Sequence, residues 1–421
     1  MISRVCPQLF EKVQSKIPDV IKRVDAIKKS NVPIGTLRIK HILGGLRGVP
    51  VLNSFTCEMS PEQGPLIRGK TINELLRLLP LQDGCLYPES MFWYLLTGEI
   101  PTQQEISSLI NSLDAVSQLP EQVIKTLDTL PQNFPATSLL SIGIMALQEN
   151  SQFASAYSTI KRKDLWIPAF EDSLVILAKL PVLAAYIYCK RSGIDINNTD
   201  FKDIGGKFLG LIGAGTPNNI GFLRLFLSLY CDSDSGSVGA HASKAIGSPL
   251  SDPFKSIAGA INGVSGHLHG KAVQDSLEWI IKANNFYLAQ ANRDINDNKS
   301  IPGFGHAVLG RRDPRYDIIH DYWKSKDPKN PWLINIEKAA EEVPKLLRGK
   351  LRDPQVNGDF ISGAALYSFG VRDGEMGPVL FGVSRAMTCL ANYIWDRACE
   401  MPIEYAMSFD INGLETIAKS N

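Results

Sequence analysis

The chain has 421 residues, of which 44% are hydrophobic and 21% are charged. This composition is typical of globular proteins with a large buried core and excludes disordered and fibrous classes. Lys and Arg total 44 against 43 Asp and Glu, so the net charge of +1 gives no chain-wide attraction to nucleic acid or to an anionic membrane. The seven cysteines are widely spaced and include no CxxC pair, which indicates a reducing compartment rather than a disulfide framework or a zinc knuckle.

Neither a membrane span nor an export signal is predicted. The most apolar stretch, 174–188, is interrupted by Lys179 and Pro181 and is shorter than the ~18 to 20 residues that cross a bilayer. The first 30 residues mix acidic with basic side chains, unlike a transit peptide, and the final AKSN does not match a peroxisomal SKL tail. We expect a protein of the cytoplasm or the mitochondrial matrix.

The predicted elements are mostly helices. Apolar residues recur at spacings of three, four and seven from Leu9 to Ile27, which predicts an amphipathic helix with a kink at Pro18. Two alternating runs, 33–39 and 49–56, are the strand candidates. Helical periodicity dominates the rest and predicts helices over 72–79, 91–96, 104–116, 123–130, 137–148, 172–190, 220–230, 257–264 and 273–283.

Two long breaks, 300–314 and 349–359, fall in the C-terminal third of the chain. They indicate a smaller second domain there, and loops between domains are where binding residues collect. The predicted class is therefore mainly α.

Three of the six histidines lie in two short loops framed by glycines. The segment SGHLHG at 265–270 holds His267 and His269, and PGFGHA at 302–307 holds His306. Because glycine lets the backbone approach a ligand closely, a histidine in such a loop can reach one. A third segment, VNGDFISG at 356–363, places Asp359 before an apolar run, where it reads alone as a helix N-cap. Each residue taken singly also fits a surface or packing role.

Together these three segments resemble the citrate synthase family. Further motifs follow in the family's order: GGLRG (44–48), PESMFWYLLTGEIPT (88–102), KRKDLW (161–166), the AKLP turn (178–181), GAHASKAIGSPLSDPF (239–254) and FGVSRAM (381–387). The chain most resembles the all-helical eukaryotic form. The resemblance implies a homodimer of two-domain chains, in which 1–270 and 371–421 form a large domain and 271–370 a small domain that closes over the substrates.

The resemblance also implies an acyltransferase that condenses acetyl-CoA, or a longer acyl-CoA, with a 2-oxo acid and needs no further cofactor. Asp359 is then the base that removes the α-proton, His269 donates to the thioester oxygen, and His306 donates to the keto oxygen of the second substrate. An α-proton beside a thioester is weakly acidic, so the carboxylate needs a partner that stabilises the enol or enolate. A neutral His269 requires a pKa held low by burial or by a helix N-terminus.

Substrate-binding residues follow from the same resemblance. Arg315, in the DPRY motif, and Arg385 align with ligands of the oxo acid. The candidate cations for the CoA phosphates are Arg47, Arg162, Arg311 or Arg312, Lys350 and Arg352, with Arg162 acting across the dimer interface. An ordinary solvated charge is the alternative for each.

Two positions of the expected oxo-acid pocket depart from the family's pattern. Ser233 stands in place of a further His, and Tyr405, in PIEY, in place of an Arg that reaches into the partner's site. A hydrogen bond to a charged group contributes ~1.5 to 3 kcal/mol, so the two losses cost on the order of 3 to 6 kcal/mol of binding. Two residues are candidates to replace the missing His and Arg: Tyr405 itself, and His267, which stands where the family commonly has Pro. The alternative is that both only fill space.

Four functions are consistent with these residues. The first is a citrate synthase-like acyltransferase whose oxo acid or acyl chain has changed, and the second is an ordinary citrate synthase with a rewired pocket. The third is a catalytically silent structural or regulatory paralogue, and the fourth is the same site running backwards as a lyase. A dinucleotide site at 210–215 is disfavoured because Asn218 replaces the third glycine of the fingerprint. No metal is expected at His267 and His269, since no carboxylate or thiol stands nearby at ligand spacing.

Overall fold

The computed structural model describes residues 5–82, 84–231, 235–306, 308–351 and 353–420. The helices of this part of the chain are α1 (Pro7–Lys28), α2 (Ile39–Leu43), α3 (Ile72–Leu78), α4 (Pro88–Thr97), α5 (Gln103–Ala115), α6 (Glu121–Asp128), α7 (Ala136–Ala146), α8 (Gln152–Ala156), α9 (Trp166–Ser192), α10 (Ile204–Leu211), α11 (Pro217–Tyr230), α12 (Val238–Gly247), α13 (Pro253–Val264), α14 (Ala272–Ala283), α15 (Tyr287–Asn296), α16 (Pro314–Lys326), α17 (Pro331–Leu347), α18 (Gly358–Ser368), α19 (Met376–Ala398) and α20 (Ile411–Lys419). Two short 3₁₀ turns, Gln148–Asn150 and Arg162–Asp164, complete them. The mainly α prediction is confirmed.

The strands are few and short. An antiparallel sheet has the order β1 (Cys57–Ser60), β2 (Gly64–Ile67) and β3 (Lys70–Thr71), and β4 (Leu81–Gln82) pairs with β5 (Cys85–Leu86). The predicted strands at 33–39 and 49–56 are wrong. Both runs lie in mostly exposed segments in which no strand is assigned. Their alternating pattern therefore does not correspond to the two faces of a sheet.

The core is built around two long helices. Every residue of α19 is buried, and α9 runs beside it with most of its residues buried too. By length and composition α9 could cross a membrane, but 78% of its apolar window lies inside the protein, as in the core helix of a globular domain. The AKLP motif is not a turn, because α9 continues through Pro181. Packing on all sides outweighs the backbone hydrogen bond that proline removes.

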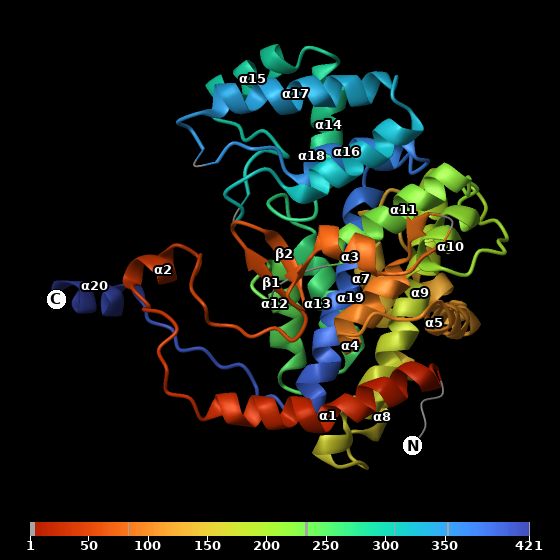
Figure 1. Cartoon of the computed structure of the whole chain (residues 1–421), viewed down its shortest axis with the longest axis vertical. Coiled ribbons are helices and arrows are strands. Elements are labelled where there is room, and N and C mark those ends of the chain that lie inside the picture. The colour runs from red at the N-terminus through yellow and green to blue at the C-terminus, as the bar shows by residue number, and fades with distance from the viewer. Residues whose placement is uncertain (1–4, 83, 232–234, 307, 352, 421) are drawn as a thin grey trace.

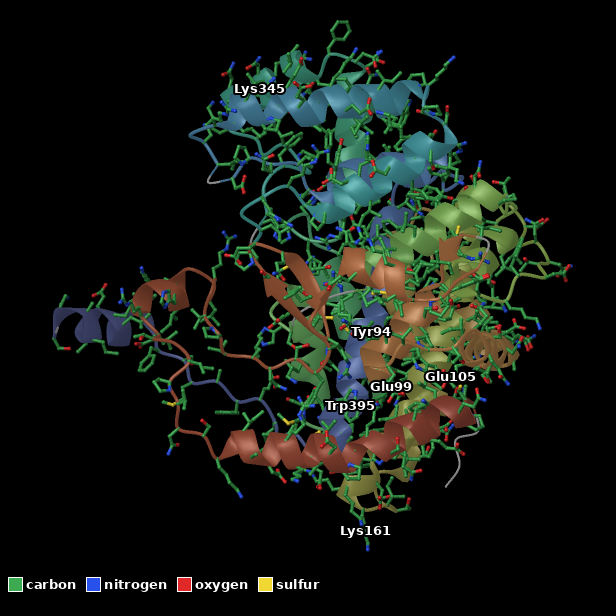
Figure 2. All side chains as sticks on the ribbon, viewed as in Figure 1. Tyr94, Glu99, Glu105, Lys161, Lys345 and Trp395 are labelled. Carbon is green, nitrogen blue, oxygen red and sulfur yellow. The ribbon has the colours of Figure 1, made fainter. Side chains whose placement is uncertain are left out.

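Helices α14 to α18 gather in an upper lobe, above a larger lobe that contains α4, α7, α9, α11, α13 and α19 (Figure 1). In the lower lobe α1 is bonded to the loop after α4 and to α5, since Lys12 Nζ lies 2.9 Å from Glu99 and 3.5 Å from Glu105. Both glutamates are labelled in Figure 2. The segments that carry α2 and α20 project from one side of the body (Figure 1). The division into domains at residues 270 and 370 stays a prediction.

Candidate active site

The loop that holds His306 is docked on the segment that holds Asp359. Phe304 pairs with Val356 in an isolated antiparallel bridge, and the amides of Gly305 and Asn357 donate to Gln355 O (2.8 Å) and Gly303 O (2.9 Å). Gly303 has a φ of +82°, and a Cβ there would lie 2.5 Å from Cβ of Phe360. Glycine is therefore required at this position. The motifs 302–307 and 356–363, which are distant in the sequence, become neighbours.

Asp359 lies in the first turn of α18. The N-cap is Asn357, whose side chain accepts from the Asp359 amide at 3.0 Å, so the N-cap reading of Asp359 is wrong and its carboxyl is available for another role. Burial raises the pKa of Asp359 to about 6, against the opposing effects of Arg315, Arg385 and a hydrogen bond from Tyr230. A carboxyl group that titrates near neutral pH is suited to act as a general base.

His269 precedes α14 and stays neutral at physiological pH. Its ring meets the edge of Phe381 at a centroid distance of 5.6 Å, and its Nε2 atom is buried without a hydrogen-bond partner among the described residues. Burial, followed by the charges of Arg385 and Arg315, lowers the pKa of His269 to about 3. A neutral imidazole can donate one N–H without carrying a charge.

His306 is held by the backbone that follows it. Its Nδ1 accepts from the amides of Val308 (3.1 Å) and Leu309 (3.0 Å), which leaves the ring proton of the neutral form on Nε2. Although part of the residue is exposed, burial of the ring and the charge of Arg315 lower the pKa of His306 to about 4. This histidine too is a neutral donor.

Arg315 connects these groups. It is buried, and its Nη2 and Nε lie 2.9 Å and 3.1 Å from the carboxylate of Asp313. Asp313 also accepts from the amide of Gly358 at 3.0 Å, so the DPRY motif is tied to the start of α18. Burial alone would raise the pKa of Asp313, but Arg315 and the backbone donors hold it below its usual range. The charge of Arg315 acts on the pKa of His269, His306 and Asp359 alike.

Arg385 and Tyr230 complete the buried site. Arg385 Nη1 donates to Ser237 Oγ at 3.0 Å, and its guanidinium lies over the ring of Phe381 at 4.9 Å. Tyr230, at the end of α11, lies with its ring under Arg315 at 5.1 Å. Neither Tyr230 nor Asp313 is predicted from the sequence. Asp313 opens the DPRY motif and could have been found there, whereas Tyr230 has no motif of its own.

His267 and Tyr405 lie on the surface, and two other predicted residues are not described. His267 is 69% exposed and its Nδ1 lies 2.7 Å from Asp275, so α14 holds it. Tyr405 is 90% exposed on the C-terminal segment. Ser233 and Arg352 fall outside the described residues.

The described candidate cations for CoA lie on the surface of the chain. Arg47, Arg311 and Lys350 are exposed. Arg162 Nε lies 3.9 Å from Glu400, and Arg312 Nε bonds Asp317 at 2.8 Å. Their role in CoA binding stays a prediction.

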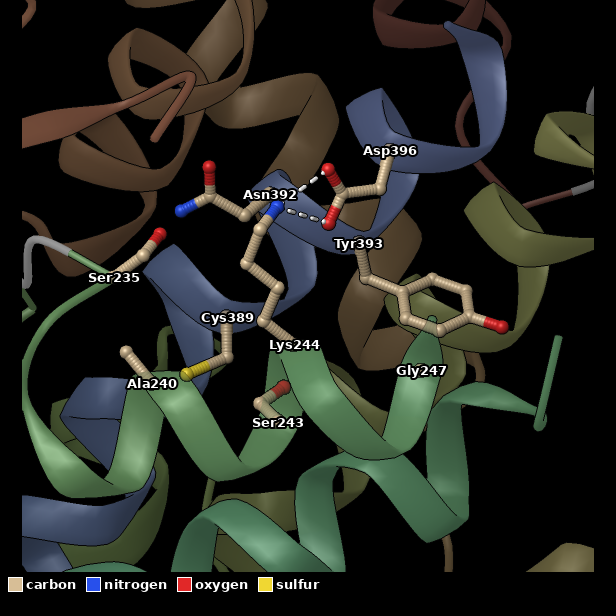
Figure 3. Close-up of a pocket in the computed structure, with 9 residues that line it drawn as sticks. All are labelled: Ser235, Ala240, Ser243, Lys244, Gly247, Cys389, Asn392, Tyr393 and Asp396. Carbon is tan, nitrogen blue, oxygen red and sulfur yellow. Dashed lines mark hydrogen bonds and ion pairs between the residues drawn. The ribbon is translucent and has the colours of Figure 1, made fainter. Parts of the chain in front are cut away.

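A separate buried pocket lies between α12 and α19, where Lys244 bonds both oxygens of Asp396 at 2.8 and 3.0 Å (Figure 3). None of its nine lining residues is a predicted site residue. The described part of the chain also contains no group of three or more His, Cys, Asp or Glu side chains that could hold a metal ion.

A sequence model of the C-terminal domain of citrate synthase matches residues 45–404. The mitochondrial citrate synthase of Daucus carota is 35% identical over 98% of this chain and 91% of that protein. The chain belongs to the citrate synthase family. Members of this family are acyltransferases, so the prediction of an acyltransferase is confirmed.

Other members of the citrate synthase family give the same result. The mitochondrial 2-methylcitrate synthase of Gibberella moniliformis is 33% identical over 97% of this chain and 92% of that protein. The solved structure of citrate synthase from Thermoplasma acidophilum, determined as a ternary complex, superimposes on this chain with a TM-score of 0.74.

 The ligands of that complex are carboxymethyl coenzyme A and oxaloacetate. The two sequences are 20% identical, and the match covers 89% of this chain and 96% of that one. At this identity the likeness shows the fold alone, and it is the two-lobed helical fold described above.

Proposed function

We propose that this chain condenses an acyl-CoA with a 2-oxo acid, and that Asp359, His269 and His306 are its catalytic residues. The observation that supports the proposal most strongly is that the charge of Arg315 acts on the pKa of all three side chains. Interactions of this kind weaken quickly with distance, so the three groups share one small space with a cation suited to a carboxylate.

Each protonation state fits one step of the reaction. Asp359, with a pKa of about 6, is mostly ionised at neutral pH and removes the α-proton of the acyl-CoA. His269 stays neutral and donates its N–H to the thioester oxygen as the enol or enolate forms. His306 donates from Nε2 to the keto oxygen of the 2-oxo acid while the carbon–carbon bond forms. Hydrolysis of the thioester then releases CoA.

The second substrate binds Arg315 and Arg385, both of which are buried in the site. The departures from the family at Ser233 and Tyr405 favour an oxo acid other than oxaloacetate, or a longer acyl chain. An ordinary citrate synthase that uses acetyl-CoA and oxaloacetate is the second candidate, and the name of the Daucus carota relative favours it. The name of the Gibberella moniliformis relative favours a product with an additional methyl group.

The protein acts as a homodimer in this proposal. The projecting segments on either side of α2 and around α20 expose many large apolar side chains: Val32, Ile34, Leu37, Leu43, Leu46, Val51, Ile403, Tyr405, Met407, Phe409 and Ile411. Apolar surface of this extent marks an interaction site. A second copy of the chain would cover it and bring Tyr405 to the partner's site, as the family resemblance implies. The names of these two relatives support mitochondria as the compartment, and of the two predicted compartments the matrix is the mitochondrial one.

The test is a CoA-release assay with a panel of acyl-CoAs and 2-oxo acids. We expect turnover with at least one pair, and a loss of about 10²- to 10⁴-fold in kcat for His306→Ala and for Asp359→Asn. Turnover near family rates with acetyl-CoA and oxaloacetate would favour the second candidate. A folded dimer that turns over no pair would instead favour the silent paralogue and contradict the proposal.

A further inference from the structure

Tyr230 contacts most of the groups that surround the reacting space. Its ring lies under the guanidinium of Arg315 and packs against Phe381 at a centroid distance of 5.1 Å. Its backbone oxygen accepts from Arg385 Nε at 3.5 Å. Tyr230 therefore contacts both arginines proposed to bind the oxo acid, Arg315 through its ring and Arg385 through its backbone oxygen, and its ring also packs on Phe381, which packs on His269.

The hydroxyl of Tyr230 reaches the first turn of α18. Its Oη lies 2.8 Å from Ser362 Oγ, and a hydrogen bond from Tyr230 lowers the pKa of Asp359. Gly358 makes this approach possible, since a Cβ at that position would lie 2.6 Å from the Tyr230 hydroxyl oxygen. Ser362 has another possible acceptor, because its Oγ lies 2.7 Å from the carbonyl oxygen of Gly358.

The two hydroxyls carry only two protons for these three contacts. If Ser362 donates to the Gly358 carbonyl, Tyr230 donates to Ser362 and has no proton left for Asp359. If Tyr230 donates to Asp359, Ser362 can donate to Tyr230. The two arrangements interchange by rotation of the two O–H bonds, without movement of any heavy atom.

We propose that Tyr230 and Ser362 form a hydrogen-bond switch that follows the protonation state of Asp359. Tyr230 donates to the carboxylate before proton abstraction and turns to Ser362 once Asp359 carries the proton, which Asp359 can then donate to the Tyr230 oxygen. The only proton that changes heavy atoms is the α-proton, which passes from the acyl carbon to Asp359. Tyr230 is thus a positioning residue that acts through Asp359, and the inference rests on the proposed role of that carboxyl group.

The other charged groups around Asp359 cannot switch in this way. Arg315 and Asp313 face it from the start of α16, and Arg385 faces it from α19. Arg315 and Asp313 are bonded to each other, and Asp313 also accepts from the Gly358 amide. Burial keeps the pKa of Tyr230 well above its ordinary value, so the hydroxyl stays a neutral donor wherever Asp359 titrates.

The test is the pH dependence of kcat/KM for CoA release by Tyr230→Phe. Loss of a hydrogen bond to the carboxylate moves the midpoint of the acid limb upward by about one to two pH units. Ser362→Ala moves it less, because Tyr230 can still donate to Asp359. Tyr316→Phe is the matched control: both tyrosines are 1% exposed, but the charged neighbours of Tyr316 are Arg312, Glu337 and Asp317, so the limb stays in place.

For a variant too slow to assay, infrared spectroscopy measures the titration midpoint of Asp359 directly. The band of its protonated carboxyl group is identified as the one that is missing in Asp359→Asn. A band that titrates in Tyr230→Phe as it does in the wild type overturns the switch alone. An acid limb that persists with full activity in Asp359→Asn overturns the proposed function and the switch with it. An upward shift in Tyr316→Phe as large as that in Tyr230→Phe also overturns the switch, because it would show a general effect of losing a buried hydroxyl.

Discussion

Burial has the largest effect on the pKa of each titratable group in the proposed site, and the charge of Arg315 acts on all three of them. Burial and Arg315 together keep His269 and His306 neutral, while Arg315 opposes the effect of burial on Asp359. The same guanidinium is neutralised in part by Asp313. A site that must hold two neutral donors beside an ionised base therefore obtains all three states from one buried ion pair and a low-polarity environment.

His269 also couples the stability of the fold to pH. Its pKa is about 3 in the folded protein, against 6.5 for an unperturbed histidine, so below pH 6.5 the unfolded chain binds a proton that the folded chain excludes. This contribution to stability is present above pH 6.5 and is lost as the pH falls toward 3, by up to about 1.4 kcal/mol per pH unit. We expect His269→Gln to remove this component, so that urea unfolding at pH 7, 6 and 5 gives a shallower slope than in the wild type.

Leu268→Gln is the control for that measurement, because Leu268 is 95% exposed in the same loop and does not titrate. It keeps the slope of the wild type. Equal slopes for His269→Gln and Leu268→Gln would contradict the low pKa of His269.

The sequence predicts the catalytic candidates but not what surrounds them. Asp359, His269 and His306 stand in short motifs whose residue types and glycines indicate chemistry. Tyr230 contacts Ser362, which is 132 positions away, and only the packing of α11 against α18 brings them together. A contact of this kind leaves no local pattern, so the proposed switch is invisible in the sequence.

At the level of elements, the close packing of α14 and α18 fixes two of the proposed catalytic residues relative to one another. A Cβ on Gly363 of α18 would lie 2.2 Å from the carbonyl oxygen of Val273 in α14. Asp359 lies one turn before this contact, and His269 lies just before the start of α14. The close approach of these helices therefore sets the position of the base relative to the donor.

Gly363→Ala is expected to destabilise the fold by about 1 to 3 kcal/mol, because a backbone oxygen must move to admit the methyl group. Chemical denaturation measures this loss, and kcat/KM falls further than the loss of folded protein explains, since Asp359 moves away from His269. Gly310→Ala serves as the control, because a Cβ there meets nothing within 4 Å. Similar stability of the two variants would argue against close packing of α14 on α18.

Element types are predicted well where a helix has one buried face, and less well elsewhere. The predicted helix at 104–116 is observed as Gln103–Ala115, with its buried residues at regular spacing. In α9 the proline of AKLP suggests a turn, but contacts from several helices keep the helix continuous. The predicted strands fail because alternation indicates a strand only where a neighbouring strand is present, which depends on distant parts of the chain.

The whole molecule exposes apolar segments that one chain alone does not cover. The C-terminal segment presents Tyr405 and Met407, which are 90% and 85% exposed. In the proposed homodimer both are covered, but only Tyr405 stands in the place of the family's substrate-binding arginine. Variants of the two residues can therefore distinguish a role in the partner's site from a role in dimer packing.

We expect Tyr405→Ala to lower kcat/KM for the oxo acid by about tenfold or more, the effect of losing one hydrogen bond to a charged substrate, while the dimer persists in size-exclusion chromatography with light scattering. Met407→Ala, the control, leaves kcat/KM near that of the wild type. Co-expression of Tyr405→Ala with Asp359→Asn produces mixed dimers with one complete site, and activity returns in them. Absence of this complementation would contradict a site shared between chains.

The ion pair of Arg315 with Asp313 also limits how this protein can evolve. In the proposed mechanism, any replacement of Arg315 changes substrate affinity and the pKa of Asp359, His269 and His306 in a single step, so few such replacements would leave a working enzyme. A lineage that adopts a new substrate can vary only residues whose loss leaves that chemistry intact. This chain departs from its family at positions 233 and 405 and retains Arg315, the combination that this constraint predicts.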